Sequence, residues 1–249
     1  MDNSNDGDIF DTGLKVNSHC DLLRQLRDID THVGPPRRRT KEQRERFCIV
    51  HFLLLLPASL LPSFPISIIR YDKKQAQQSA MDFKIAGTCS TVGIEISEAT
   101  DQDLKRIDSI VSREAPGKVW DSSQLDSVRS IKGNENIVKH VNPQKVVSYT
   151  LDSEKSINEL NDCLNKCVND NLNKISAQAN LSFNQKWLVC YPHTSHNPFS
   201  DQRPEVNRMI DGLRSSWWNS APMFDLIGVL FDESVFVVSQ RSVNHYSHE

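Results

Sequence analysis

Two acidic residues lie in neighbouring apolar stretches of the chain, within the sequences MDFKIA and TVGIEISEA. Side-chain alternation places Asp82 and Lys84 on one face of the first strand, and Glu95 and Ser97 on one face of the second. Pairing of the two strands as a hairpin around GTCST would bring the carboxylates close together. Two like charges repel, and a divalent cation removes that cost, because Mg²⁺ and Mn²⁺ prefer carboxylate oxygens. The pattern therefore indicates a metal site on Asp82 and Glu95, with two solvated acids on an exposed hairpin as the alternative.

The elements that position this hairpin follow from capping signals and hydrophobic periodicity. Thr40, with Gln43 three residues later, predicts a helix over 40–56 that stops at Pro57. Further helices are predicted at 100–113, capped by Thr100, and at 153–179 and 205–217. Strands are predicted at 66–71, 82–86, 92–97, 186–191, 226–231 and 235–239, and a short strand candidate at 145–149 lies in the ambiguous segment 117–148. This order is typical of an α/β fold with a mixed sheet.

The domain organisation is predicted from changes in composition along the chain. Residues 1–39 are polar and end in GPPRRR, which predicts a flexible arm with a short helix candidate at 20–29. Residues 40–241 carry the predicted elements and form the α/β domain. Residues 242–249 are predicted to be a C-terminal tail.

Composition limits the classes of function that need to be considered. The net charge of −3 provides no global basic field, so any contact with nucleic acid must use local patches. The six cysteines form no C-x2-C pair, and the acidic N-terminus lacks a signal-peptide pattern. We interpret the cysteines as reduced thiols and expect a cytoplasmic protein.

One apolar stretch is long enough to raise the question of a membrane role. Residues 47–69 contain no Lys, Arg, Asp or Glu. A stretch of this length is long enough to cross a bilayer. Pro57, Pro62 and Pro65 interrupt the stretch, and His51 lies in its best helical part. We favour a buried helix followed by a proline-containing turn and a strand, with membrane association as the less favoured alternative.

The order of elements around the two acids resembles the PD-(D/E)XK nuclease superfamily. Within it, the segments ERFCIVHFLLLLP, MDF, VGIEISE, KWLVCY and FDLIGVLFDESVFVVS are similar to those of an uncharacterised group of bacterial stand-alone proteins. The likeness covers about residues 40–240. It implies a restriction-endonuclease-like mixed sheet flanked by helices, hydrolysis of phosphodiester bonds with Mg²⁺ or Mn²⁺, and nucleic acid as the partner.

The resemblance also assigns roles to individual residues. Asp82 and Glu95 match the metal-binding acids, but Ser97 stands where the superfamily has a lysine that activates the attacking water. Lys84, beside Asp82, or Lys166, in the predicted helix 153–179, could supply that charge. Glu42 or Glu45 could add a further acid, and Glu98 is a weaker candidate because it points away from Glu95. Without the lysine, the alternative is a catalytically inactive nuclease fold that acts as a binding or interaction module.

Several other groups have a structural interpretation that we favour over a functional one. We expect Cys163 and Cys167 to be core thiols, and Trp217 and Trp218 to pack rather than to stack on bases. A metal site on Cys190, His193 and His196 is less favoured than a structural role for that loop. A basic cluster at the start of the first predicted helix could contact phosphate beside the acidic site; it comprises Arg37 to Arg39, Lys41, Arg44 and Arg46.

Overall fold

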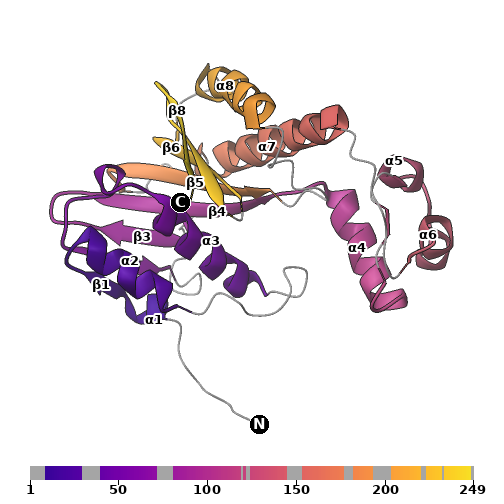
Figure 1. The fold of residues 1–249 in the computed structure, drawn as a ribbon, viewed down its shortest axis with the longest axis horizontal. Coiled ribbons are helices and arrows are strands. Elements are labelled where there is room, and N and C mark those ends of the chain that lie inside the picture. Colours follow the sequence, from indigo (N-terminus) through magenta and orange to yellow (C-terminus); the bar gives the residue numbers. More distant parts are fainter. Residues whose placement is uncertain are drawn as a thin grey trace, which may run out of the picture.

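Alternating apolar residues form an eight-stranded mixed sheet, which is the centre of the computed structural model (Figure 1). The structure describes residues 9–29, 40–71, 81–118, 120–121, 124–144, 153–176, 182–192, 203–219, 223–231 and 233–247. The strands lie side by side in chain order: β1 Leu14–Val16, β2 Ile66–Arg70, β3 Phe83–Ala86, β4 Thr91–Ala99, β5 Gln185–Pro192, β6 Leu226–Leu230, β7 Ser234–Val238 and β8 Val243–Ser247. The pairs β4–β5 and β5–β6 are parallel and the other neighbours are antiparallel.

One face of the sheet is covered by α1 Ile9–Thr12, α2 His19–Arg27 and α3 Lys41–Leu55 (Figure 1). α3 begins as predicted, because the Thr40 hydroxyl accepts from the Gln43 N–H and the Gln43 side chain accepts from the Thr40 N–H. It is followed by the short 3-10 helix η2 Ala58–Leu60 and by β2, so the predicted buried helix, turn and strand are confirmed. Among the described helices, none combines the length and hydropathy that a bilayer crossing requires.

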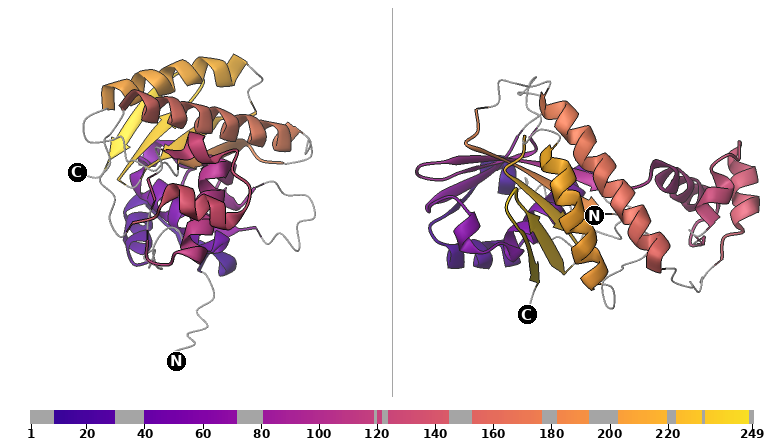
Figure 2. Two further views of the ribbon diagram at one scale, coloured as in Figure 1. Left: turned by 90° about the vertical axis from the view of Figure 1, so that its right-hand side faces the viewer. Right: turned by 90° about the horizontal axis from the view of Figure 1, so that it is seen from above.

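The opposite face is covered by α7 Ser153–Ser176 and α8 Arg203–Asn219, which lie next to each other across the sheet (Figure 2). α7 buries Leu160, Leu164, Val168 and Ile175, at the helical spacing that the sequence predicted. The two helices are the crossover connections that the parallel pairs β4–β5 and β5–β6 require. The predicted α/β class with a mixed sheet flanked by helices is therefore confirmed.

A separate helical unit is inserted between β4 and α7. It consists of α4 Gln102–Glu114, α5 Leu125–Val128 and α6 Asn134–Val141, which share an apolar cluster of their own. The unit lies beyond the end of the sheet in both Figure 1 and Figure 2. Asp101, not the predicted Thr100, caps α4, because its carboxylate accepts from the N–H groups of Asp103 and Leu104.

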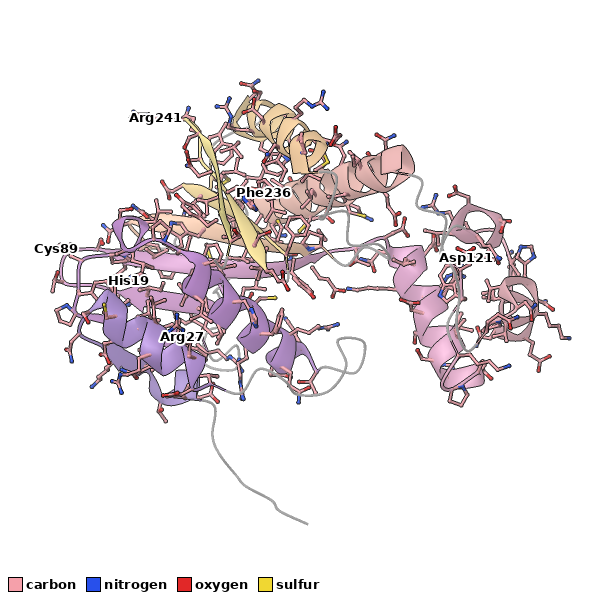
Figure 3. The ribbon with its side chains drawn as sticks, in the orientation of Figure 1. His19, Arg27, Cys89, Asp121, Phe236 and Arg241 are labelled. Atoms are coloured by element: carbon pink, nitrogen blue, oxygen red, sulfur yellow. The ribbon has the colours of Figure 1, made fainter. Side chains whose placement is uncertain are left out.

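The predicted domain boundaries are too narrow at both ends of the described chain. Residues 9–29 form α1, β1 and α2, and Phe10, Leu14 and Leu22 are buried in the same apolar cluster as α3. This part of the chain is a packed element and not a flexible arm. Residues 243–247 form β8, which pairs with β7 beyond the turn that contains Arg241 (Figure 3). The strand candidate at 145–149, His193, His196 and Arg37 to Arg39 lie outside the described residues.

Candidate active site on β3 and β4

The predicted hairpin is present, and Asp82 directly precedes its first paired residue. β3 and β4 pair antiparallel, with Phe83 opposite Ile94 and Ala86 opposite Thr91. The ladder ends at Phe83 and Ile94, and the Asp82 N–H donates to the Ile94 carbonyl, so Asp82 stands at an irregular position beside Ile94 and not directly opposite Glu95. The turn between the strands, which contains Cys89, lies at the far end of the hairpin from the two acids (Figure 3).

Asp82 forms hydrogen bonds with β4 and with the residue that follows β2. Its side chain is buried, with 2% of its surface exposed. The Ile96 N–H donates to Asp82 Oδ2 at 2.8 Å, and the Asp82 N–H donates to the Ile94 carbonyl at 2.8 Å. The Asp82 carbonyl accepts from the Tyr71 N–H at 2.9 Å. The carboxylate thus bonds the backbone of β4, which fixes its position beside the residue that follows Glu95.

Glu95 faces α7, which supplies a lysine. Lys174 Nζ lies 3.7 Å from Glu95 Oε1; the carboxylate side chain is 11% exposed and the lysine side chain 56%. Lys174 Nζ also donates to Asn171 Oδ1 at 3.0 Å. Asn171 is 1% exposed, and its Nδ2 donates to the Cys167 carbonyl at 2.8 Å. The ammonium group is therefore held between Glu95 and a buried amide while most of its side chain remains open to solvent.

The two lysines proposed from the sequence occupy different positions. Lys84 is half-buried on β3, opposite Gly93 in the β3–β4 register. Lys166 is exposed on α7, eight residues before Lys174. Sequence reasoning missed Lys174, although one signal was present: it lies beside the buried stripe of α7, directly before Ile175 and three residues after Asn171.

Two buried thiols lie between α7 and β5, close to Lys174 and Asn171. Cys167 Sγ and Cys190 Sγ are 3.6 Å apart and both residues are buried, as the core-thiol interpretation predicted for Cys167. The hydrogen bond with Cys190 lowers the pKa of Cys167, as do the Ser97 hydroxyl and the charge of Lys174, against the effect of burial. The same hydrogen bond and burial raise the pKa of Cys190. Half-buried Cys163 has its pKa raised to about 12, mainly by burial.

The acids of α3 lie on the other side of the sheet from Lys174. Glu45 is buried, with Lys41 Nζ 3.4 Å from its Oε1. Glu98, as predicted, points away from Glu95: its Oε2 lies 2.7 Å from Lys105 Nζ and 3.4 Å from Arg44 Nη1. Glu42 is exposed, and hydrogen bonds from its own backbone N–H and from Thr40 lower its pKa.

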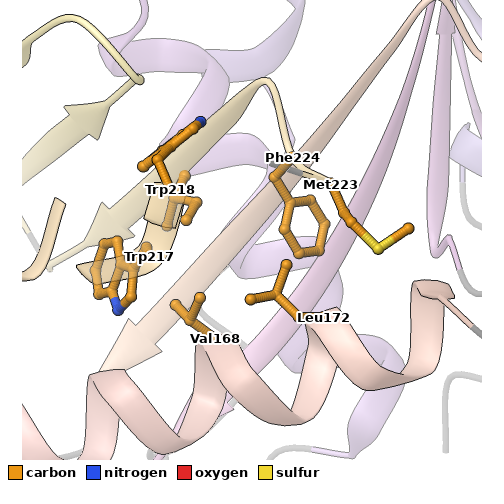
Figure 4. Close-up of a pocket in the computed structure, with 7 residues that line it drawn as sticks. Val168, Leu172, Trp217, Trp218, Met223 and Phe224 are labelled. Atoms are coloured by element: carbon orange, nitrogen blue, oxygen red, sulfur yellow. The ribbon is translucent and has the colours of Figure 1, made fainter. Parts of the chain in front are cut away.

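A cavity of about 120 Å³ opens on this α3 side of β4. Its walls are Lys41, Arg44, Glu45, Cys48, Ile96, Glu98 and Tyr191. A second space, of only about 10 Å³, lies between α7, α8 and β6 (Figure 4). It is lined by apolar side chains that include Trp217 and Trp218, and Trp217 Nε1 donates to Asn165 Oδ1 at 2.9 Å. Trp217 is buried, which confirms its predicted packing role.

Carboxylate oxygens are the ligand type that Mg²⁺ and Mn²⁺ prefer. In the part of the chain that the structure describes, no group of three or more His, Cys, Asp or Glu side chains is placed to hold a metal ion. Mg²⁺ at phosphate-processing sites is commonly held by only one or two carboxylates, together with water and substrate phosphate. Asp82, which directly precedes β3, and Glu95 of β4 are two such carboxylates.

Comparisons with protein-family models, with curated proteins and with solved structures give no match.

Proposed function

We propose that the protein is a metal-dependent nuclease that hydrolyses phosphodiester bonds of nucleic acid at Asp82 and Glu95. The observation that carries the proposal is the 3.7 Å contact between Lys174 Nζ and Glu95 Oε1. Ser97 leaves the motif without its lysine on β4, and Lys174 supplies a positive charge to the same carboxylate from α7. Apart from η2 and the inserted helices α4, α5 and α6, the order α3, β2, β3, β4, α7, β5 resembles the helix, three strands, helix and strand of the PD-(D/E)XK superfamily.

The chain's own groups have distinct tasks in this proposal. Asp82 and Glu95 would hold Mg²⁺ or Mn²⁺, which when bound supplies an activated water and neutralises phosphate charge. Lys174 presents N–H donors and a positive charge where negative charge develops on the phosphate in the transition state. Asn171 holds the Lys174 ammonium by a 3.0 Å hydrogen bond, so it is a positioning residue. The Ile96 N–H fixes the Asp82 carboxylate.

The test is cleavage of labelled single- and double-stranded DNA and RNA by the full chain with Mg²⁺ or Mn²⁺. We expect cleavage that EDTA stops and that Asp82→Asn and Glu95→Gln abolish. Lys174→Met should cost more activity than Lys84→Met or Lys166→Met, which ranks the three lysines directly. Lys139→Met, an exposed lysine of α6, is the matched control. Cleavage that survives in both acid variants contradicts the proposal.

The second candidate is an inactive nuclease fold that binds nucleic acid or a protein without cleaving. Ser97, in place of the motif lysine, is the observation that favours it. Binding of labelled nucleic acid without any metal-dependent cleavage, unchanged in Glu95→Gln, would support this candidate over the nuclease.

A further inference from the structure

We propose that the cavity on the α3 side of β4 binds one nucleotide unit, with the base inside and the phosphate at Lys41 and Arg44. The inference deepens the proposed function and rests on it for the substrate class. It assigns to that substrate an unpaired base with an exocyclic amine, turned into the protein beside the acidic site.

The position and size of the cavity fit a ligand. Ile96 and Glu98 of β4 and Tyr191 of β5 line it, and these residues lie near the carboxyl ends of two parallel strands. This edge is where open α/β sheets usually bind ligands. A single water needs roughly 10–15 Å³, so a space of about 120 Å³ is no packing defect. The space beside Trp217, by contrast, is about 10 Å³.

The inner wall suits a planar ring. Ile96, Cys48 and Tyr191 supply apolar surface, and Tyr191 is half-buried. The Tyr191 ring is positioned by Phe47 of α3, whose ring meets it edge-on with centroids 5.8 Å apart. Stacking on an aromatic ring is the usual way in which proteins hold an unpaired base, whatever the base is.

The acids on the wall favour particular bases. Glu45 and Glu98 line the cavity, and an ionised carboxylate can only accept hydrogen bonds. Glu98 is held in place by Lys105 at 2.7 Å and by the Thr100 hydroxyl at 3.3 Å. An exocyclic amine has two N–H donors, so adenine, cytosine and guanine suit a wall with two carboxylates, whereas uracil and thymine offer only the single N3–H.

The cations at the cavity suit the phosphate. Lys41 and Arg44 line it, with side chains 60% and 40% exposed, in the first turn of α3. The N–H groups of a helix N-terminus favour anions, and the two cations add to that attraction. Among the lining side chains these two cations balance Glu45 and Glu98, and Lys105 Nζ adds a further positive charge 2.7 Å from Glu98.

The cavity is connected to the acidic site through one residue. Ile96 lines the cavity with its side chain, and its backbone N–H donates to Asp82 Oδ2 at 2.8 Å. Because Glu95 and Lys174 lie on the other face of the sheet, a strand held there would have to pass the carboxyl end of β4 to bring a neighbouring phosphodiester to them. The cavity would thus select where along a single strand the chain is cut.

The test is calorimetric titration of the full chain in EDTA with AMP, CMP, GMP, UMP, ribose 5-phosphate and adenosine. We expect AMP to bind at least tenfold more tightly than ribose 5-phosphate, and UMP to be the weakest nucleotide. Arg44→Ala should weaken AMP binding about tenfold. Glu98→Gln should bring AMP and UMP within about twofold of each other. Arg208→Ala, an exposed arginine of α8 paired with Glu205 at 3.0 Å, is the matched control.

Equal binding of AMP and ribose 5-phosphate would overturn the base pocket, and so would AMP affinity that Arg44→Ala and Glu98→Gln leave unchanged. Failure of the nuclease proposal looks different. Glu95→Gln should bind AMP like the unmodified chain while losing cleavage. AMP binding without cleavage of any nucleic acid contradicts only the nuclease proposal. Cleavage without AMP binding contradicts only the proposal of a nucleotide-binding cavity.

Discussion

Glu95 and Glu98 lie three residues apart on β4 and face opposite sides of the sheet, where their surroundings differ. On the α7 side, Glu95 meets Lys174, whose ammonium is held by Asn171 above two buried thiols. On the α3 side, Glu98 meets Arg44 and Lys105 at the wall of a cavity of about 120 Å³. One strand therefore presents a tightly bonded polar group to one helix and an open charged space to another.

In the proposed nuclease, this difference separates two requirements that a hydrolase has to meet. Reacting groups must be held in a fixed geometry, and the hydrogen bonds of Asp82, Lys174 and Asn171 serve that need. A substrate must enter and leave, and exposed cations around a cavity serve that need. We therefore expect changes on the α7 side to affect the chemical step, and changes on the α3 side to affect binding.

The largest expected effect is a split between the two glutamates in cleavage kinetics. Glu95→Gln should lower kcat by at least about 100-fold, or about 2.7 kcal/mol, because it removes a metal-binding charge. Glu98→Gln should raise KM and change kcat by less than about threefold, since it alters only the cavity wall. Steady-state cleavage of one oligonucleotide measures both. Equal losses of kcat would remove the distinction between the two sides.

Asp82→Ala is expected to have the largest effect on stability among these site residues. The substitution removes the acceptor of the part-buried Ile96 N–H, which should cost about 1–3 kcal/mol in the free energy of unfolding. Asp82→Asn keeps an oxygen in place and should cost less. Urea denaturation measures both, and Asp211→Ala, an exposed acid of α8, is the control. An unchanged midpoint for Asp82→Ala would show that the bond contributes nothing.

Lys174→Met should change the titration of Cys167. Its positive charge helps to keep the pKa of Cys167 below the ordinary value, so the substitution should raise that pKa. A pKa that folding lowers adds stability above the unfolded pKa, and this gain is lost as pH falls through the folded pKa. Lys174→Met should therefore reduce the gain in stability at high pH.

The ¹³Cβ shift of Cys167, followed against pH by NMR, measures this change. Lys139→Met in α6 should leave the curve in place. A curve that does not move in Lys174→Met would mean that the lysine does not act on the thiol pair.

The smallest expected effect is that of Lys41→Ala on stability. Lys41 is 60% exposed and lies 3.4 Å from Glu45 one turn along α3, and such pairs contribute roughly 0.3–0.5 kcal/mol. We expect a loss below about 1 kcal/mol in urea denaturation, together with weaker AMP binding. A loss above about 2 kcal/mol would mean that the lysine is part of the fold and that the α3 side resembles the α7 side.

The hairpin could be predicted because its signals are local. Alternation and the short link between the strands predicted the pairing that residues 83–86 make with residues 91–94. The start of α3 could be predicted for the same reason, because a capping box is a motif of only four residues. β1 and β8 were missed because they are short or polar, with the sequences LKV and VNHYS. α5 and α6 have four and eight residues, too few for a clear periodicity.

Lys174 could not be assigned for a different reason. Periodicity predicted the buried face of α7, but not how the helix crosses β4, which depends on its packing against α8 and the sheet. The crossing determines which lysine of the helix reaches Glu95. The cavity also could not be predicted from the sequence. It forms where α3 meets the ends of β4 and β5, and these three elements are far apart along the chain.

The parallel pairing of β4 with β5 sets an order for assembly of the site. Asp82 and Ile96 are 14 residues apart, whereas Thr91 and its partner Asn184 are 93 residues apart. Local contacts generally form before distant ones, because their loop closure costs less entropy. During synthesis, the hairpin with both acids also leaves the ribosome before α7 does. The two negative charges should therefore meet before their lysine arrives, and docking of α7 completes the site.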